Sequence, residues 1–284
     1  MKKFKLLIAL LIGVLAVAMA GCGEDTEKNL PNKDELEVGV ITHLNASEEK
    51  YNEFMKGLEQ SYRPSKENKT MNYHYYNNLN EMQMALKSNQ IDLISTYQFV
   101  AAYMTGRDNT LDIVPADKNL EDSFCFAVKG DNTELLSQFD NAISEMTADR
   151  TMANLAEQYI TNVTRGEEPK AVSIAEIAGA ETLKVAVTGD LPPFDMMTAD
   201  GTPTGYSTAV MAEISKRIGK NIEFVSVDSA ARATALVSNK VDVVFWVAVP
   251  NDGTLVPGNI DTPEGLALSK PYYVESITYI ASKK

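Results

Sequence analysis

Residues 85–94 read ALKSNQIDLI, and residues 235–244 read ALVSNKVDVV. Each stretch ends an amphipathic run, turns at Ser-Asn and then passes, through an Asp, into an apolar run of strand type. In both halves of the chain the neighbouring segments alternate strand, helix, strand, helix, strand, which is typical of a mostly parallel sheet covered by helices. The repeat therefore predicts one strand–helix–strand corner in each of two α/β lobes. The alternative is a chance likeness between two ordinary turns.

The same periodicities divide the rest of the chain into segments. In the first half we expect strands at 36–41, 71–78, 91–96, 111–116 and 124–130, with helices at 46–60, 79–90, 98–106 and 133–160. In the second half we expect strands at 182–189, 221–227 and 241–249 and one within 269–284, with helices at 206–219 and 229–239. The charged, Gly- and Pro-containing stretch 162–181 marks the boundary between the halves.

The N-terminus has the pattern of an export signal. Lys2, Lys3 and Lys5 precede an apolar run from Leu6 to Ala20, which is shorter than the roughly 20 residues that a membrane-spanning helix needs. The run closes with Met-Ala-Gly before Cys22 and resembles the lipobox of bacterial lipoproteins. We therefore expect residues 1–21 to be a lipoprotein signal peptide and Cys22 to be acylated. The alternative is an ordinary signal peptide cleaved near Ala20.

These boundaries predict the organisation of the mature chain. Residues 22–34 are polar and form a tether. The first lobe with its closing helices covers 35–165, a linker covers 166–181, and the second lobe covers 182–284.

Composition excludes several classes of function. The formal net charge is −13, and loss of the signal removes three lysines and no acid, so we expect no nucleic acid partner. The chain has two cysteines and two histidines. With Cys22 consumed by the lipid, Cys125 is expected to be a buried thiol, and no Cys or His motif predicts a metal or another cofactor.

The second half carries a family likeness. A strand is followed by Pro-Pro-Phe at 192–194, Gly-Tyr at 205–206, a helix, the repeat stretch at 235–244 and Pro-Tyr-Tyr at 271–273. This order resembles the first lobe of the bacterial extracellular solute-binding proteins for amino acids, which have the type 2 periplasmic-binding-protein fold. The resemblance implies two lobes, each a mostly parallel sheet flanked by helices, around a ligand cleft.

The first half resembles the family's other lobe. The stretches EVGVI, EMQMALKSNQIDLISTYQFVAAYM and FCFAVKGDNTELL carry this likeness. In most members the Pro-Pro-Phe lobe comes first, whereas here it comes second. The sequence therefore predicts a circular permutation, which is feasible when chain termini lie close together. Duplication of a first-lobe-like half is the alternative.

The resemblance also implies a function. It predicts a monomeric, lipid-anchored receptor on the extracytoplasmic face of the cell membrane, which binds a small polar or amino-acid-like solute by hinge closure and delivers it to an ABC transporter permease. A sensing receptor without transport is the main alternative. A periplasmic dehydratase-like enzyme is a further alternative, although no nucleophile, base and orienting group stand together in the sequence, and we expect no catalysis.

Ligand contacts are expected where strands end, because ligands of open α/β sheets bind beyond the carboxyl ends of the strands. From the lobe in the second half of the chain, the expected contacts are Asp190, Phe194, Tyr206, Arg232, Trp246 and Tyr272. Arg232 in particular is a candidate clamp for a carboxylate. From the first lobe they are Thr42, Asn45 and Ser47, with His43 beside them, and Thr96 and Tyr97.

The chain departs from the amino-acid binders at two positions. The segment VAVPNDGTLVPGN lacks the Arg that commonly holds an α-carboxylate, and Tyr97 stands where an Asp commonly holds the α-amino group. An unpaired ammonium or carboxylate in a cleft is expensive. The departures therefore argue against an ordinary α-amino acid and favour a more aromatic cleft.

Overall fold

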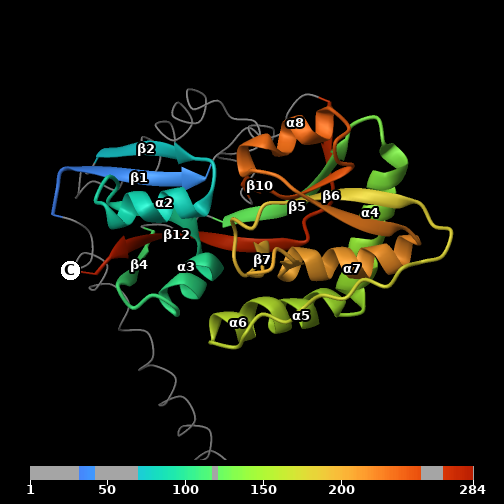
Figure 1. Ribbon diagram of the computed structural model, residues 1–284, viewed down its shortest axis with the longest axis horizontal. Helices are drawn as coiled ribbons and strands as arrows, with labels where there is room; N and C mark the ends of the chain where they lie inside the picture. Colours follow the sequence, from blue (N-terminus) through green and yellow to red (C-terminus); the bar gives the residue numbers. More distant parts are fainter. Residues whose placement is uncertain (1–31, 42–69, 117–120, 251–264, 284) are drawn as a thin grey trace, which may run out of the picture.

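The computed structural model describes residues 32–41, 70–116, 121–250 and 265–283. The fold is α/β with two lobes side by side, joined by strands that pass from one to the other (Figure 1). We call lobe A residues 32–116 with 277–283, and lobe B residues 121–250 with 265–276. The predicted fold class is confirmed.

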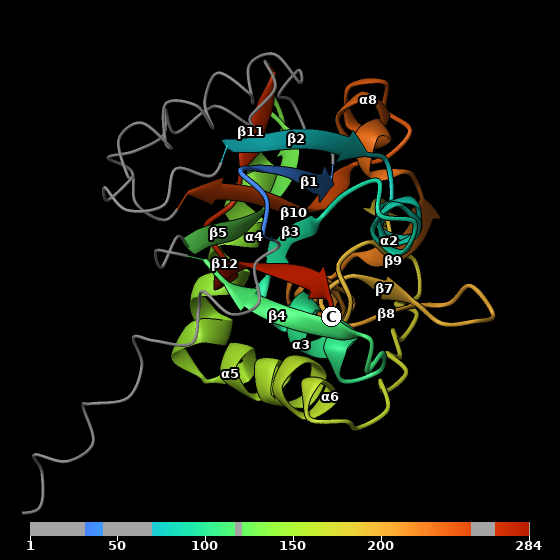
Figure 2. The same cartoon turned by 90° about the vertical axis from the view of Figure 1, so that its left-hand side faces the viewer.

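Lobe A has a five-stranded sheet with the order β2-β1-β3-β12-β4, which Figure 2 shows as a stack seen from one end. Four strands point one way, and β12 runs antiparallel between β3 and β4. The elements up to β4 are β1 (Glu35–Ile41), β2 (Thr70–Tyr76), α2 (Leu79–Lys87), β3 (Leu93–Tyr97), α3 (Gln98–Thr105) and β4 (Leu111–Pro115). The helix expected at 46–60 lies outside the described residues.

Lobe B repeats this order with its own antiparallel strand. Its sheet runs β9-β6-β10-β5, with β11 and the start of β12 on the far side of β5. The strands are β5 (Glu121–Lys129), β6 (Thr182–Val187), β7 (Met196–Met197), β8 (Pro203–Thr204), β9 (Asn221–Ser226), β10 (Val243–Pro250), β11 (Leu266–Leu268) and β12 (Tyr273–Ser282). The helices are α4 (Thr133–Ala148), α5 (Thr151–Ala156), α6 (Asn162–Thr164), α7 (Tyr206–Ile218) and α8 (Arg232–Val237), with a π-helical turn at Glu157–Thr161 and a 3₁₀ turn at Ser229–Ala231.

In each lobe, the antiparallel strand comes from a part of the chain that directly follows the other lobe. β5 follows the last strand of lobe A and pairs with β10 of lobe B. β12 pairs with β5 at 273–276 and then enters lobe A, where residues 277–282 pair with β3 and β4. Strand pairing thus mixes the two sequence blocks that the linker 166–181 separates.

The repeated stretch forms the same corner twice. Asn89 and Asn239 have φ of 57° and 59°, in the left-handed region that Asn tolerates. The following Asp then ties its strand to the first strand of the lobe. Asp92 donates its N–H to Glu37 and accepts from the N–H of Glu37, and Asp242 makes the same exchange with Lys184. The predicted strand–helix–strand corner in each lobe is confirmed.

An aromatic core joins the lobes. Phe194 of lobe B stacks on Phe99 of lobe A with ring centroids 5.0 Å apart, and it also contacts Phe124 at 4.8 Å. All three side chains are at most 2% exposed. Because burying an aromatic side chain is worth several kcal/mol, this contact holds the two lobes in the arrangement of Figure 1.

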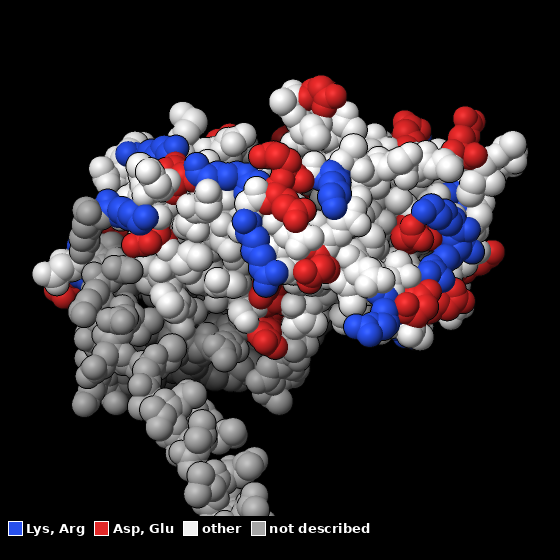
Figure 3. All heavy atoms as spheres, turned by 90° about the horizontal axis from the view of Figure 1, so that it is seen from below, with Lys and Arg blue, Asp and Glu red and all other residues white. Residues whose placement is uncertain are grey.

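Ion pairs hold the helices of lobe B together at the surface. Arg217 of α7 pairs with Asp149 at 2.7 Å and with Glu145 at 3.4 Å, both near the end of α4. On the face seen from below, acidic and basic side chains of the described residues are interspersed (Figure 3). No helix among the described segments is long and apolar enough to span a membrane.

Candidate functional site

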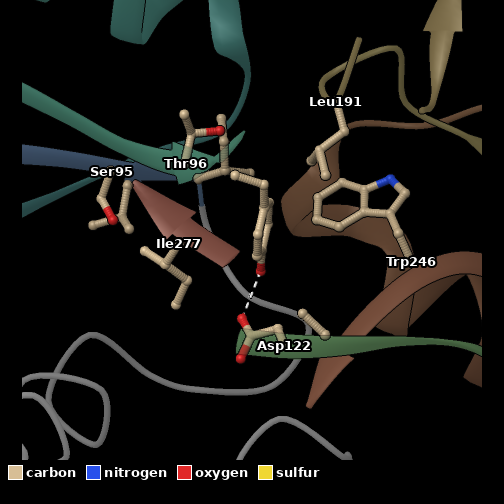
Figure 4. Close-up of a pocket in the computed structure, with 10 residues that line it drawn as sticks. Ser95, Thr96, Asp122, Leu191, Trp246 and Ile277 are labelled. Carbon is tan, nitrogen blue, oxygen red and sulfur yellow. Dashed lines mark hydrogen bonds between the residues drawn. The ribbon is translucent and has the colours of Figure 1, made fainter. Parts of the chain in front are cut away.

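A small cavity lies between the lobes (Figure 4). Its volume is about 50 Å³, which is room for a few water molecules. Lobe A contributes the ends of β1 and β3 and part of β12, where parallel strands present their carboxyl ends. Lobe B contributes β5, the loop after β6, and β10. The lining residues are Val40, Ile41, Ser95, Thr96, Tyr97, Asp122, Leu191, Trp246, Ala248 and Ile277.

An irregularity in β10 directs Trp246 toward the cavity. The pairing of β10 with β5 shifts register between Val244 and Val247, and Trp246 takes φ of 42°. A bulge of this kind re-aims a side chain, and strained backbone of this kind gathers at binding sites. The indole Nε1 donates to Asp195 at 2.8 Å, which fixes the plane of the ring.

Arg232 supports the indole from behind. Its guanidinium carbon lies 3.5 Å from the centroid of the Trp246 ring. Nε donates to the carbonyl of Ser229, and Nη1 donates to the carbonyls of Phe245 and Trp246. Arg232 is 1% exposed and is not among the residues that line the cavity. These contacts hold Arg232 against the bulge of β10, and its role as a carboxylate clamp stays a prediction.

Tyr97 and Asp122 form a polar pair across the cavity wall. The Tyr97 hydroxyl donates to Asp122 Oδ2 at 2.8 Å, shown dashed in Figure 4. The Tyr97 ring packs edge-on against Phe124 at 4.7 Å, so hydroxyl and ring are both oriented. Asp122 is 8% exposed. The carboxylate of Asp122 thus forms part of the cavity wall on the side of lobe B.

Two more carboxylates lie behind the cavity in the loop after β6. Asp195 is fully buried and accepts from Thr188, Gly189 and Trp246. Burial raises its pKa, and these donors oppose the rise. Asp190 accepts from the N–H of Leu79 in lobe A at 3.0 Å and from the hydroxyl of Ser229 at 2.6 Å. Burial raises its pKa as well.

The structure brings only some of the expected residues to the cavity. Thr96, Tyr97 and Trp246 line it. Phe194 is in the aromatic core between the lobes, where its ring is fully enclosed, and Tyr206 lies beside it with its hydroxyl on the carbonyl of Tyr272. Tyr272 is buried too, and its hydroxyl bonds Ser207 and the N–H of Trp246. Cys22, Thr42, His43, Asn45 and Ser47 lie outside the described residues.

Sequence reasoning missed several contributors, among them Asp122, Leu191 and Asp195. Asp195 stands directly after Pro-Pro-Phe, and an acid in so apolar a turn is a usable signal. Leu191 stands inside the same turn, next to the expected Asp190. Asp122 lies near the start of a strand in the first block, and no signal in the neighbouring sequence indicates that this strand joins the sheet of lobe B. Among the described residues no group of three or more His, Cys, Asp and Glu side chains is placed to hold a metal ion.

Comparison with solved structures returned distant likenesses. One is the GluR0 ligand-binding core in complex with L-glutamate, with TM-score 0.42, 10% identity, and coverage of 89% of this chain and 87% of that chain. A second is the alkanesulfonate-binding protein SsuA from Xanthomonas axonopodis pv. citri bound to MOPS, with TM-score 0.40, 10% identity, and coverage of 89% and 66%. A third is the reduced OxyR regulatory domain from Pseudomonas aeruginosa, with TM-score 0.39, 9% identity, and coverage of 87% and 88%.

Comparison of sequences is more specific. No curated protein matches the chain. Residues 183–250 match the family model of the bacterial extracellular solute-binding proteins, family 3. The match runs from β6 to β10 and includes the turn with Asp190 and Asp195, the start of α8 with Arg232, and the bulge with Trp246. The stretch from β6 to β10 thus matches the bacterial extracellular solute-binding proteins, family 3, and it lies within a two-lobed α/β fold.

Proposed function

We propose that the protein is an extracytoplasmic solute-binding lipoprotein that takes up a small solute in the cavity between its lobes. One observation carries this proposal. The cavity lies at the carboxyl ends of β1 and β3 and against the bulge of β10. This bulge belongs to the segment that matches the solute-binding family. Ligands of α/β sheets bind at such strand ends.

Binding and release take place by movement of the lobes about two strands. β5 and β12 are the described strands that connect the sheets of the lobes, and they pair with each other at 121–124 and 273–276. A hinge of a few residues absorbs such a motion. In the described arrangement the lobes are in contact through Phe99 and Phe194 and through Leu79 and Asp190, which corresponds to the closed form.

The partner in this proposal is the permease of an ABC-type uptake system. Acylation of Cys22 holds the receptor at the extracytoplasmic face of the cell membrane, and more than one acyl chain makes such anchoring stable. Tethering raises the effective concentration of receptor at the permease. Labelling of the protein with radioactive palmitate in cells tests the anchor, because Cys22→Ser removes the label if the proposal holds. Label that persists in Cys22→Ser contradicts it.

The bound solute leaves unchanged in this proposal. The lining contributed by the described residues offers one carboxylate and several hydroxyls, without a histidine or a cysteine. General acid–base work needs a pair of groups within reach of one substrate, and Tyr97 and Asp122 already bond each other. Recovery of a chemically altered solute after incubation with the protein contradicts the proposal.

A binding screen tests the central claim. The mature protein, extracted in detergent, is melted in the presence of amino acids, amines, organic acids, nucleosides and short peptides. A solute that binds only the folded state stabilises it by about 2.7 kcal/mol at a hundredfold excess over Kd. Fluorescence of Trp246, the one tryptophan of the chain, gives an independent signal from the cavity. A well-folded protein that responds to no class of solute contradicts the proposal.

We also propose that the lobe order arose by circular permutation. The family match begins at residue 183, after the whole of the first block. The two lobes have the same strand order, and the antiparallel strand of each comes from a part of the chain that directly follows the other lobe. Either lobe can therefore come first in the chain. A rearranged chain that starts at Glu181 and joins Lys283 to Asp34 through a Gly-Ser linker is expected to fold and to bind the same solute. A rearranged chain that does not fold contradicts this proposal.

A further inference from the structure

We infer that Asp190 is a latch between the lobes, which keeps the cavity closed until its bond to Leu79 breaks and so controls the entry of the solute. This inference rests on the proposed function, since it assigns the regulation of the same cavity. The carboxylate acts by joining equivalent points of the two lobes.

Each oxygen of the Asp190 carboxylate accepts a hydrogen bond, one of them from the other lobe. Oδ1 accepts the backbone N–H of Leu79 in lobe A at 3.0 Å, and Oδ2 accepts the hydroxyl of Ser229 in lobe B at 2.6 Å. The backbone N–H of Asp190 donates to Thr188 Oγ1 at 3.1 Å, which helps to fix the loop that carries the carboxylate. Asp190 is 7% exposed. A hydrogen bond to a charged acceptor is among the stronger kinds, and here water competes little for the donors.

The two donors stand at equivalent points of the lobes. Leu79 begins α2, and Ser229 begins the 3₁₀ turn that leads into α8. Residues 79 and 229 are 150 positions apart, as are residues 85 and 235, where the repeated stretches begin. Asp190 thus lies where corresponding elements of the two lobes face each other. A movement that separates the lobes therefore has to break its bond to Leu79.

The aromatic contact between the lobes lies at the hinge. Phe194 contacts Phe124 and Tyr273 at ring distances of 4.8 and 5.5 Å, and these two residues pair with each other in β5 and β12. A contact beside the pivot can be kept while the lobes turn, whereas the described partners of Asp190 belong to neither hinge strand. Arg107 of lobe A also bonds two carbonyls of lobe B, but at 3.4 and 3.3 Å, longer than ordinary hydrogen bonds. Opening therefore depends most on the bond of Asp190.

The latch stands directly beside the cavity. Leu191, the next residue, lines the cavity together with Trp246. The cavity measures about 50 Å³, whereas pockets for organic ligands measure about 300 Å³ or more. A solute therefore enters when Leu191 and Trp246 move away from lobe A, and the latch opposes that movement. Since apparent affinity falls with the fraction of molecules that can bind, the strength of the latch sets how tightly the solute is held.

Two readouts measure the opening without a solute. Spin labels are attached to cysteines placed at Asn80 and Ala230, which are exposed residues beside the latch in lobe A and lobe B. The parent is the mature chain with Cys22→Ser, in which Cys125 is buried, and electron paramagnetic resonance gives the distance between the labels. Quenching of Trp246 fluorescence by acrylamide, in unlabelled protein, reports access to the cavity wall.

Variants on both sides of the bond assign the effect. Asp190→Ala removes the acceptor, and Leu79→Pro removes the donor at a first helical position, where Pro is tolerated. Each is expected to raise the open population about tenfold or more, with a longer distance between the labels and stronger quenching. Asp190→Asn keeps both contacts, because the Ser229 hydroxyl can accept as well as donate, and Leu79→Ala keeps the N–H. Both are expected to resemble the parent, and the variant with Asp190→Ala and Leu79→Pro together is expected to open no further than either alone.

Two outcomes overturn the inference. One is an unchanged distance and unchanged quenching in Asp190→Ala and in Leu79→Pro. The other is equal opening in Leu79→Ala and Leu79→Pro, which would assign the effect to the side chain of Leu79. Where Asp190→Ala does not melt cooperatively, the comparison of Leu79→Pro with Leu79→Ala decides. Since neither readout needs a solute, both outcomes leave the proposed function standing, and the solute screen decides that function separately.

Discussion

The carboxylate of Asp190 accepts the backbone N–H of Leu79 at 3.0 Å, so a loop of lobe B binds the first residue of α2 in lobe A. The N–H groups of the first turn have no partner within their own helix, and the positive end of the helix favours an anion. The second carboxylate oxygen accepts from Ser229. This carboxylate thus joins the two lobes through a hydrogen bond between them.

Asp190→Ala is expected to open the molecule. The substitution leaves two buried donors, the N–H of Leu79 and the hydroxyl of Ser229, without this acceptor, and each such loss is worth about 1–3 kcal/mol. We expect a larger radius of gyration by small-angle X-ray scattering and a lower free energy of unfolding in urea. Asp228→Ala, an exposed acid next to Ser229 in the loop after β9, is the control and should change neither. An unchanged radius for Asp190→Ala contradicts a latching role.

The two corners are expected to respond alike to mutation. Asn89→Ala and Asn239→Ala each place a Cβ-bearing, non-amide residue at positive φ, which destabilises by about 1 kcal/mol. Asn89→Gly and Asn239→Gly are the matched controls and should be near neutral, because Gly adopts this conformation freely. Urea unfolding measures all four. Because the corners lie in different lobes, the double Ala variant should show the sum of the two losses, and a response at one corner alone speaks against their equivalence.

Trp246→Phe is expected to destabilise the protein more at neutral pH than in mild acid. The indole N–H lowers the pKa of Asp195, which burial raises, so the variant raises this pKa further. A carboxyl with a raised pKa in the folded state binds its proton more tightly folded than unfolded. Its contribution to stability is therefore present at low pH and is lost as the pH rises through the raised pKa.

The free energy of unfolding at pH 4, 5.5 and 7 gives the measurement for this variant. The deficit of Trp246→Phe relative to the parent should grow with pH. In an Asp195→Asn background the pH dependence of the deficit should vanish, because the titrating group is gone. A deficit that is constant with pH in both backgrounds rules out the assigned contact between Trp246 and Asp195.

Cys125 is expected to be inert in the folded protein. Burial raises the pKa of its thiol to about 12, and the thiolate is the reactive form. At pH 8 the thiolate fraction falls on the order of a thousandfold below that of an ordinary cysteine. With Cys22→Ser as the parent, a thiol reagent such as DTNB should react only after addition of denaturant. Rapid reaction of the native protein contradicts the buried placement.

Local sequence predicts the elements of this protein and the repeated corner well, because periodicity, Asn at the turn and Asp after it are all short-range signals. It also predicts Thr96 and Tyr97 at the cavity, since both lie at the end of a strand, and it predicts Trp246 there, although the structure places Trp246 at a bulge within β10. The position of Asp122 depends on which sheet β5 joins. That is determined by the pairing of β5 with β10, which lies more than a hundred residues later in the chain. The placements of Arg232 and Phe194 depend likewise on tertiary packing. Arg232 lies against the indole of Trp246, and Phe194 packs in the aromatic core between the lobes.

The path of β12 has a consequence for how the protein is made. Its residues 277–282 form the middle of the lobe A sheet, and Thr278 donates to the carbonyl of Val114 across 164 residues of chain. During synthesis β3 and β4 therefore lack their pairing with β12 until the ribosome has produced all of lobe B. Unpaired strand edges of this kind favour aggregation. The lobe that is translated first is the lobe that folds last.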